Sequence, residues 1–453
     1  MDFLTVEETA QRLGVKRETV YAYASRGLLT SVRGARRRGS RFARAEVEAL
    51  AARGREAGEP SGVVERIRTG ITLVADGGPW FRGVPAAGLA ARADLAEVAA
   101  LLWDVPGPVR FDADPELLAV AGAALAALPA RARSTDRFRV AVAAVAAADP
   151  LRADVRPAAV SRTAATLLGT VVAALGGAAS PAAPAAPAAP AAPAAPAAPV
   201  AQPTPVAQPT SAAQPTPAAQ PTPAAPEPPP GPDPAVLLWP ALARDPAADP
   251  GTGPDHLRAA LVLLADHGLA ASTVAARVAA STLADVHAVV SAGLGALDGP
   301  RHGLAGTLAH RFLAEALDDP HAALAARLRA GERVPGFGHS VYRGADPRAV
   351  ALLDRLRTDP RADRVLACVD ALTDGMARGD GPAPNVDLAL AALMHAHDLR
   401  PDAGELVFAT ARTVGWVAHA LEEYAEPGPR FRPLGVYTGP RPQTPQQTPQ
   451  RPG

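Results

Sequence analysis

Apolar residues recur at helical spacing through most of the chain. Ala and Leu dominate residues 115–177 in repeats of this kind, and a later stretch, 257–269, carries leucines on one helical face. The same spacing predicts helices at 282–297 and 304–316, separated by a Gly-Pro break. An all-α fold is therefore expected for the main part of the chain.

Two short strands are expected ahead of these helices. Ile71-Thr-Leu-Val-Ala leads into a Gly-Gly turn, and Trp80-Phe-Arg-Gly-Val-Pro follows it. A helix with an apolar face at 95–102 comes next. The hairpin and this helix mark the start of the large helical region.

The first 55 residues have a different pattern, typical of a compact helix-turn-helix unit. Thr5 and Glu8 have the spacing of a capping box, which predicts a helix that ends before Gly14. A second helix is expected at 16–26, burying Val20 and Ala24. Its other face exposes polar and aromatic residues.

A basic segment follows at 30–45 and contains six arginines and no acid. The unit resembles the small winged helix-turn-helix domains of the MerR and excisionase type, in which the second helix enters the major groove and the wing contacts phosphate. Six uncompensated arginines favour an anionic partner such as DNA. The residues expected to contact DNA are Lys16, Arg17, Thr19, Tyr21, Arg36, Arg37, Arg38 and Arg41. The alternative is a module that mediates protein contacts, with these arginines facing solvent.

Residues 178–233 are rich in Pro and Ala, with Pro-Ala-Ala repeated at a period of three. A proline every few residues prevents regular helix and sheet, so polyproline conformation or disorder is expected. The resemblance to a known family, given below with the residues that carry it, continues on both sides of this segment and implies a surface insertion whose ends lie close together. It is expected to be dispensable for chemistry, and the tail 440–453 is expected to be disordered.

Charge and cysteine content narrow the functional classes. The net charge is 0, so no overall field favours nucleic acid or membrane, although residues 1–55 alone carry 12 Lys and Arg against 6 Asp and Glu. Cys368 is the single cysteine, which excludes an internal disulfide framework and a cysteine-based metal cluster. No signal peptide is recognised, and the apolar window 164–179 is interpreted as a buried helix. A cytoplasmic protein without a membrane span is expected.

The segment 333–348 combines one histidine with arginines and glycines, and it reads as an anion-binding catalytic loop. Gly336 and Gly338 let the backbone turn around His339, and Arg343 and Arg348 offer forked donors to carboxylates or phosphates. Further polar islands interrupt apolar surroundings at Ala265-Asp-His267, Gly299-Pro-Arg-His302, Pro384-Asn-Val-Asp387, Ala411-Arg412 and Arg430-Phe-Arg432.

Three of these islands also have simpler interpretations. His267 at a helix end could be a satisfied structural group, and His302 or Asn385-Val-Asp387 could cap the helices that follow. Arg412 has no acid within four positions in an apolar run, so a buried anion is needed to balance it. A histidine such as His302, just before a helix, is favoured in its neutral form.

In order and separation, these islands resemble the citrate synthase family over residues 70–439, with one interruption. The resemblance implies a large and a small helical domain. The expected organisation is 1–55 winged helix-turn-helix, 63–177 large domain, 178–233 insertion, 234–299 large domain, 300–400 small domain, 401–439 large domain and 440–453 tail.

The resemblance also implies roles for the residues. Asp387 would abstract the proton from acetyl-CoA, while His302 stabilises the enolate and His339 donates to the ketone of oxaloacetate. His267, Arg348, Arg412 and Arg432 would bind oxaloacetate, with Arg432 supplied across a homodimer, and Arg343 would face CoA phosphate. Acetyl-CoA is a substrate in this scheme, and no metal or other cofactor is expected.

Two alternatives stay open at this stage. One is 2-methylcitrate synthase, which uses propionyl-CoA, because the acyl pocket cannot be located from sequence. The other is a DNA-binding regulator that uses the synthase fold as a metabolite sensor. The family usually has a polar residue shortly after the position of His267, where this chain has Gly268 and Ala270.

Overall fold

The structure is a computed structural model, and it divides the chain into two compact units, 68–428 and 1–67 with 429–453. It describes residues 3–13, 17, 20–21, 24, 29–33, 40–48, 67–75, 77–179, 231–300, 302–427 and 431. Predicted sites and segments that lie outside the described residues are Lys16, Thr19, Arg36, Arg37, Arg38, Arg432, most of the helix expected at 16–26, most of the insertion and the tail.

The N-terminal unit contains β1 (Phe3–Thr5), α1 (Val6–Leu13), β2 (Ser31–Arg33) and β3 (Ser40–Ala43). The strands form an antiparallel sheet in the order β1-β3-β2, so the described parts of the basic segment are two paired strands, as expected of a wing. The capping box is confirmed, because Glu8 accepts from the Thr5 N–H at 2.8 Å and Thr5 Oγ1 accepts from the Glu8 N–H at 3.2 Å. Val20 and Phe42 are buried in the small core.

The main unit opens with the predicted hairpin, extended by a third strand. β4 (Thr72–Ala75), β5 (Gly78–Phe81) and β6 (Val84–Pro85) form an antiparallel sheet in that order. Phe81 is fully buried and anchors the sheet to the helical core.

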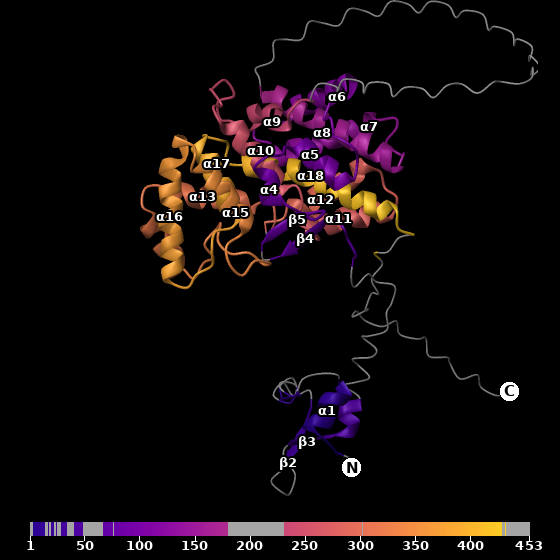
Figure 1. The fold of residues 1–453 in the computed structure, drawn as a ribbon, viewed down its shortest axis with the longest axis vertical. Coiled ribbons are helices and arrows are strands. Elements are labelled where there is room, and N and C mark those ends of the chain that lie inside the picture. Colours follow the sequence, from indigo (N-terminus) through magenta and orange to yellow (C-terminus); the bar gives the residue numbers. More distant parts are fainter. Residues whose placement is uncertain are drawn as a thin grey trace, which may run out of the picture. The chain divides into compact units, whose positions relative to one another are not determined.

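Helices make up the rest of the main unit, in agreement with the predicted all-α class (Figure 1). They are α4 (Ala86–Ala90), α5 (Leu95–Trp103), α6 (Pro115–Ala126), α7 (Ser134–Ala148), α8 (Pro157–Ala179), α9 (Pro234–Leu242), α10 (Gly253–Leu264), α11 (Ala271–Ser281), α12 (Val286–Leu297), α13 (Ala305–Ala316), α14 (Pro320–Arg329), α15 (Pro347–Leu356), the 3-10 turn η1 (Pro360–Ala362), α16 (Asp363–Arg378), α17 (Val386–Ala396) and α18 (Ala403–Tyr424).

Helix α18 forms the centre of the main unit. It packs against α5, α7, α8, α10, α11 and α12, and nearly all its residues are buried. Helices α13, α15, α16 and α17 gather on one side of it, coloured orange in Figure 1. These four come from the range expected to form the small domain; the domain boundaries themselves stay a prediction.

The helix predicted at 282–297 begins later than expected. Leu283 has a φ of +60°, which ends the preceding helical segment, and Asp285 caps α12 by accepting from the Ala288 N–H at 2.9 Å. Apolar spacing continued across this break, so periodicity alone did not reveal it.

The helices that flank the insertion pack directly against each other. A Cβ placed at Gly176 of α8 would lie 2.2 Å from the carbonyl oxygen of Leu237 in α9, so the two backbones touch there. This confirms that the two ends of the insertion lie close together. By length and composition, Pro157–Gly177 alone among the described helices could cross a membrane, and 67% of its apolar window is buried inside the fold.

Candidate active site

Six of the predicted site residues line one cavity of about 740 Å³ in the main unit. They are His267, His302, His339, Arg348, Asp387 and Arg412. Arg343 is exposed and is not among the lining residues, so its contact with CoA stays a prediction.

Backbone hydrogen bonds fix the 333–348 loop to the segment that precedes α17. The Gly338 N–H donates to the Ala383 carbonyl at 2.8 Å, and the Asn385 N–H donates to the Gly336 carbonyl at 2.9 Å. Asn385 Nδ2 also donates to the Gly338 carbonyl at 2.8 Å. Two polar islands far apart in sequence are thereby joined, and His339 and Asp387 are held on the same cavity.

The two glycines of the loop are needed for this geometry. Gly336 and Gly338 have φ values of +83° and +82°, a region that side chains disfavour. A Cβ on Gly336 would also lie 2.8 Å from Cβ of Leu388. The prediction that these glycines turn the loop is confirmed.

Asp387 lies at the start of α17 without acting as its cap. The cap is Asn385, whose Oδ1 accepts from the Asp387 N–H at 3.0 Å, which leaves the Asp387 carboxyl to face the cavity. Burial raises the pKa of this carboxyl to about 6, with Arg348 lowering it and Asp346 raising it further. A carboxylate with this pKa accepts a proton more readily than an ordinary aspartate.

His339 is oriented by its own loop. Its Nδ1 accepts from the Val341 N–H at 3.0 Å, so the neutral ring carries its proton on Nε2. Burial, followed by the charge of Arg348, lowers the pKa of His339 and favours that neutral ring. Arg348 Nη2 lies 3.3 Å from Nε2, and since both atoms carry hydrogen this is a contact in which the Nε2–H stays free for an acceptor.

His302 is held by a buried serine at the start of α11. Its Nε2 lies 2.8 Å from Oγ of Ser272. Burial, followed by the charge of Arg412, lowers the pKa of His302 to about 4. The imidazole is therefore neutral near pH 7, as the sequence predicted.

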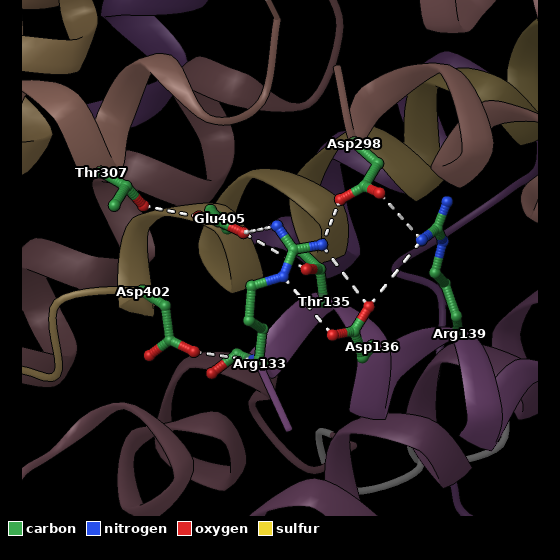
Figure 2. Close-up of polar contacts among 9 residues, drawn as sticks. Arg133, Thr135, Asp136, Arg139, Asp298, Thr307, Asp402 and Glu405 are labelled. Carbon is green, nitrogen blue, oxygen red and sulfur yellow. Dashed lines mark hydrogen bonds and ion pairs between the residues drawn. The ribbon is translucent and has the colours of Figure 1, made fainter. Parts of the chain in front are cut away.

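A polar network holds the segment of His302 from both sides (Figure 2). Before His302 in the sequence, the Asp298 carboxylate accepts a hydrogen bond from Arg133 and another from Arg139 Nη1 at 3.1 Å. After it, Thr307 donates to the buried Glu405 at 2.6 Å. Arg133 Nη1 also lies 3.7 Å from Glu405 Oε2, so the contacts of Asp298 and those of Thr307 belong to one network. The ends of this segment are thus tied to α7 and α18.

His267 receives support that the sequence did not reveal. Its Nε2 lies 2.8 Å from the hydroxyl of Tyr342, in the 333–348 loop. Burial, followed by the charges of Arg348 and Arg412, lowers the pKa of His267 to about 2. The neighbouring Asp266 accepts from the Gly268 N–H at 2.8 Å, which fixes the turn after the histidine.

Arg348 is buried and paired within its own helix start. Asp346 caps α15 and accepts from Arg348 Nε at 3.0 Å and Nη2 at 2.8 Å. Asp346 also accepts from the Val386 N–H at 3.1 Å. The guanidinium is therefore held rigidly where α15 meets the start of α17.

Arg412 is a buried cation with incomplete pairing. Its Nε donates to the Leu264 carbonyl at 3.0 Å and its guanidinium lies over the ring of Phe408 at 4.6 Å. Among the described residues, its Nη2 has no hydrogen-bond partner. Burial lowers the pKa of Arg412 to about 10, partly offset by Asp266. The site thus has a donor that a ligand carboxylate would satisfy.

Sequence reasoning missed Ser272, Tyr342 and Asp346. Asp346-Pro347 is a readable helix start, an acidic cap followed by proline, and could have been found. Ser272 and Tyr342 touch histidines that are 30 and 75 residues away in sequence. No local pattern predicts such contacts.

The N-terminal unit exposes the described members of its predicted DNA-binding set, Arg17, Tyr21 and Arg41. Arg17 pairs with Glu7 at 2.9 Å, and both side chains are about 60% exposed. Such an exposed pair is weak and can be exchanged for a phosphate.

Comparisons with known proteins cover both units of the chain. Residues 62–434 match the family model described as "Citrate synthase, C-terminal domain", and residues 3–55 match a helix-turn-helix domain. Citrate synthase 2 of Bacillus subtilis is 36% identical over 186 residues, 40% of this chain and 50% of that protein. The 2-methylcitrate synthase of Mycobacterium tuberculosis is 33% identical over 184 residues, 40% of this chain and 47% of that protein. The chain thus spans about half the length of the curated relatives it matches.

Solved structures show the same fold. Citrate synthase of Thermoplasma acidophilum aligns with a TM-score of 0.62 at 23% identity, covering 86% of this chain and 97% of that one. Citrate synthase of Pyrobaculum aerophilum aligns with a TM-score of 0.61 at 24% identity, covering 84% and 92%. With the family model matching most of its length, the chain belongs to the citrate synthase family and carries a helix-turn-helix domain ahead of it.

Proposed function

We propose that the chain is a citrate synthase that condenses acetyl-CoA with oxaloacetate and water to give citrate and CoA. The observation that carries this proposal is the convergence of neutral histidines, a carboxyl with a raised pKa and two buried arginines on one cavity. This set can abstract a weakly acidic proton and bind a dianion at the same time. The structure from Thermoplasma acidophilum is a ternary complex with carboxymethyl coenzyme A and oxaloacetate, that is, with a coenzyme A derivative and a dicarboxylate.

The first step is formation of the enolate. The Asp387 carboxylate takes a proton from the methyl group of acetyl-CoA, and its raised pKa improves the match to that weak acid. With the Ser272 hydroxyl donating to Nε2 of His302, the ring proton lies on Nδ1 and donates to the enolate oxygen. A neutral imidazole suits this task because it does not fully transfer its proton.

The second step forms the carbon–carbon bond. The enolate carbon attacks the ketone of oxaloacetate, whose oxygen accepts the hydrogen of His339 Nε2 as negative charge develops there. Water then hydrolyses the citryl thioester and releases CoA. Asp387, His302 and His339 supply the proton transfers and hydrogen bonds of the condensation in this scheme, and the proposal includes no metal or other cofactor.

The carboxylates of oxaloacetate would meet His267, Arg348 and Arg412 from this chain. Arg412 Nη2 provides the unpaired donor described above. The partner subunit's Arg432 would complete the binding of the dianion, and a homodimer is therefore part of the proposal.

The CoA part of the bound substrate would extend from the reaction site along the 333–348 loop. A second cavity of about 550 Å³ shares six residues of that loop with the first, including Arg333 and His339. Arg333 lines both cavities and is a second candidate, beside Arg343, for contact with CoA phosphate.

The test is release of free CoA thiol by purified protein supplied with oxaloacetate and either acetyl-CoA or propionyl-CoA. Turnover with acetyl-CoA supports the proposal. Preference for propionyl-CoA would favour 2-methylcitrate synthase, which is kept as the second candidate because curated relatives carry that name too. Absence of turnover from folded, dimeric protein would refute both and favour a metabolite sensor.

We also propose that the N-terminal unit binds DNA through its second helix and wing. The exposed Arg17, Tyr21 and Arg41 support this. Fluorescence anisotropy of the full chain with labelled duplex DNA, repeated at several salt concentrations, tests it. Binding that weakens steeply with salt, and weakens again in Arg41→Gln, is expected. No binding at low salt would refute the proposal.

A further inference from the structure

Away from the candidate active site, two histidines and one aspartate meet in the core. His256 lies on α10, Asp359 caps η1, and His397 caps the end of α17. Their side chains are 4%, 5% and 1% exposed. None of the three lines the cavity that holds Asp387.

The distances within this cluster match those around a bound metal ion. Nε2 of His256 and Nε2 of His397 each lie 3.3 Å from Oδ2 of Asp359, and one ligand atom from each residue can be chosen so that all lie within 4.8 Å of one another. Zinc binds such atoms at about 2.0–2.1 Å in a tetrahedron, which separates neighbouring ligand atoms by about 3.3–3.4 Å. The separations of 3.3 Å between Asp359 Oδ2 and the two Nε2 atoms therefore match the distance between neighbouring ligand atoms of a tetrahedral zinc site.

Nε2 of each histidine approaches Asp359 Oδ2 at 3.3 Å, but the geometry is poor for a hydrogen bond. None of the four ring nitrogens of His256 and His397 has a hydrogen-bond partner among the described residues. Buried polar atoms without a partner are rare in native proteins and call for a specific explanation.

The carboxylate is held in place for a ligand. Thr252 Oγ1 donates to Asp359 Oδ2, and the Arg361 N–H donates to Oδ1 at 2.9 Å. Such support orients a ligating carboxylate. A small cavity of about 60 Å³, lined in part by His397, Trp239 and Arg361, adjoins the cluster and has room for a water molecule.

We propose that His256 Nε2, His397 Nε2 and Asp359 Oδ2 bind one Zn²⁺ ion, with water as the fourth ligand. Nitrogen and oxygen donors from two histidines and one carboxylate are a known ligand set for this ion. The ion would join the first turn of α10 to the residue that caps the C-terminal end of α17. It is a structural cross-link between two helices that lead to the candidate active site, since His267 follows α10 and Asp387 lies at the start of α17.

The test uses full-length protein without an affinity tag, stripped with a chelator and titrated with zinc sulfate. One zinc per chain is expected by elemental analysis after dialysis. His397→Gln and Asp359→Asn should each weaken binding at least about tenfold. The matched control is His395→Gln, because His395 lies on the same helix end and stacks on His310 instead; it should bind as the parent does.

Cobalt(II) supplies a measurement that needs no variant. Wild-type protein loaded with one Co²⁺ should show the intense visible bands of a tetrahedral site, without the thiolate charge-transfer band that a cysteine ligand would add. Absence of stoichiometric zinc in folded wild-type protein, a six-coordinate cobalt spectrum, or equal binding by folded His397→Gln and Asp359→Asn would each overturn the proposal.

Discussion

Replacing Asp387 with asparagine should remove activity and at the same time stabilise the protein at high pH. The carboxyl has an ordinary pKa of 3.8 and a pKa of about 6 in the fold, with burial as the main cause. A group whose pKa is raised by folding contributes stability below its unfolded pKa and loses it as the pH rises through the folded pKa. Ionised Asp387 therefore costs stability at neutral and alkaline pH.

The size of the effect follows from this difference. About two pKa units correspond to about 3 kcal/mol at pH 8, and about half of that at pH 5, where Asp387 is still largely protonated in the fold. With an unfolding entropy of roughly 2 cal/mol/K per residue over about 300 ordered residues, the midpoint of thermal unfolding should rise by about 5 °C at pH 8 and by about 2.5 °C at pH 5. These are upper values, because the carboxyl faces a cavity that water can enter.

Calorimetry at both pH values measures the stability, and CoA thiol release measures turnover. The asparagine side chain cannot accept the proton, so kcat should fall roughly 10²–10⁴-fold. Asp374→Asn is a matched control, because Asp374 is exposed on α16 and should change neither property. A stabilisation that is the same at both pH values, or a kcat within tenfold of the parent, would refute the reasoning.

Three further outcomes are expected. Gly336→Ala should destabilise the fold by about 1–3 kcal/mol and lower kcat, because the residue has a positive φ and little space beside Leu388. The control is Gly344→Ala, where a Cβ meets no atom within 4 Å, and it should be nearly neutral in the same unfolding and turnover assays. Glu405→Gln should lower the free energy of unfolding, measured with a chemical denaturant, by about 1–3 kcal/mol, because it disturbs the hydrogen bonds from two threonines. It should also lower kcat more than it changes KM. An unchanged kcat would contradict the link between Glu405 and the His302 segment. Deleting 180–230 and joining the ends with a short glycine linker should leave kcat within about twofold, since the flanking helices already touch, and loss of folded protein on gel filtration would show that the segment has a structural role.

Much of the architecture could be predicted from local rules. The capping box of Thr5 and Glu8, the hairpin near Ile71 and the two positive-φ glycines of the 333–348 loop follow from residue type and spacing, and the structure confirms them. The six cavity residues were predicted because their islands resemble a known family in order and separation. Their meeting on one cavity depends on packing that spans the chain.

Pairings between distant residues could not be predicted in the same way. Local sequence showed that Arg412 lacks a nearby acid, but the Leu264 carbonyl and the ring of Phe408 that hold it emerge only when α10 and α18 pack. The support of His267 by Tyr342 has the same origin. The residues that follow His267 in the sequence offer few polar side chains, whereas the contact that supports it comes from another loop.

The backbone bonds between the 333–348 loop and residues 383–385 have a consequence for divergence. They make His339, Arg348 and Asp387 parts of one block, so substitutions there disturb several reacting groups together. The rest of the cavity includes apolar side chains outside this block, among them Val74 and Leu308. Under the proposed function, selection could therefore change the size of the accepted acyl group by exchanging such residues, while the arrangement of His339, Arg348 and Asp387 is inherited unchanged.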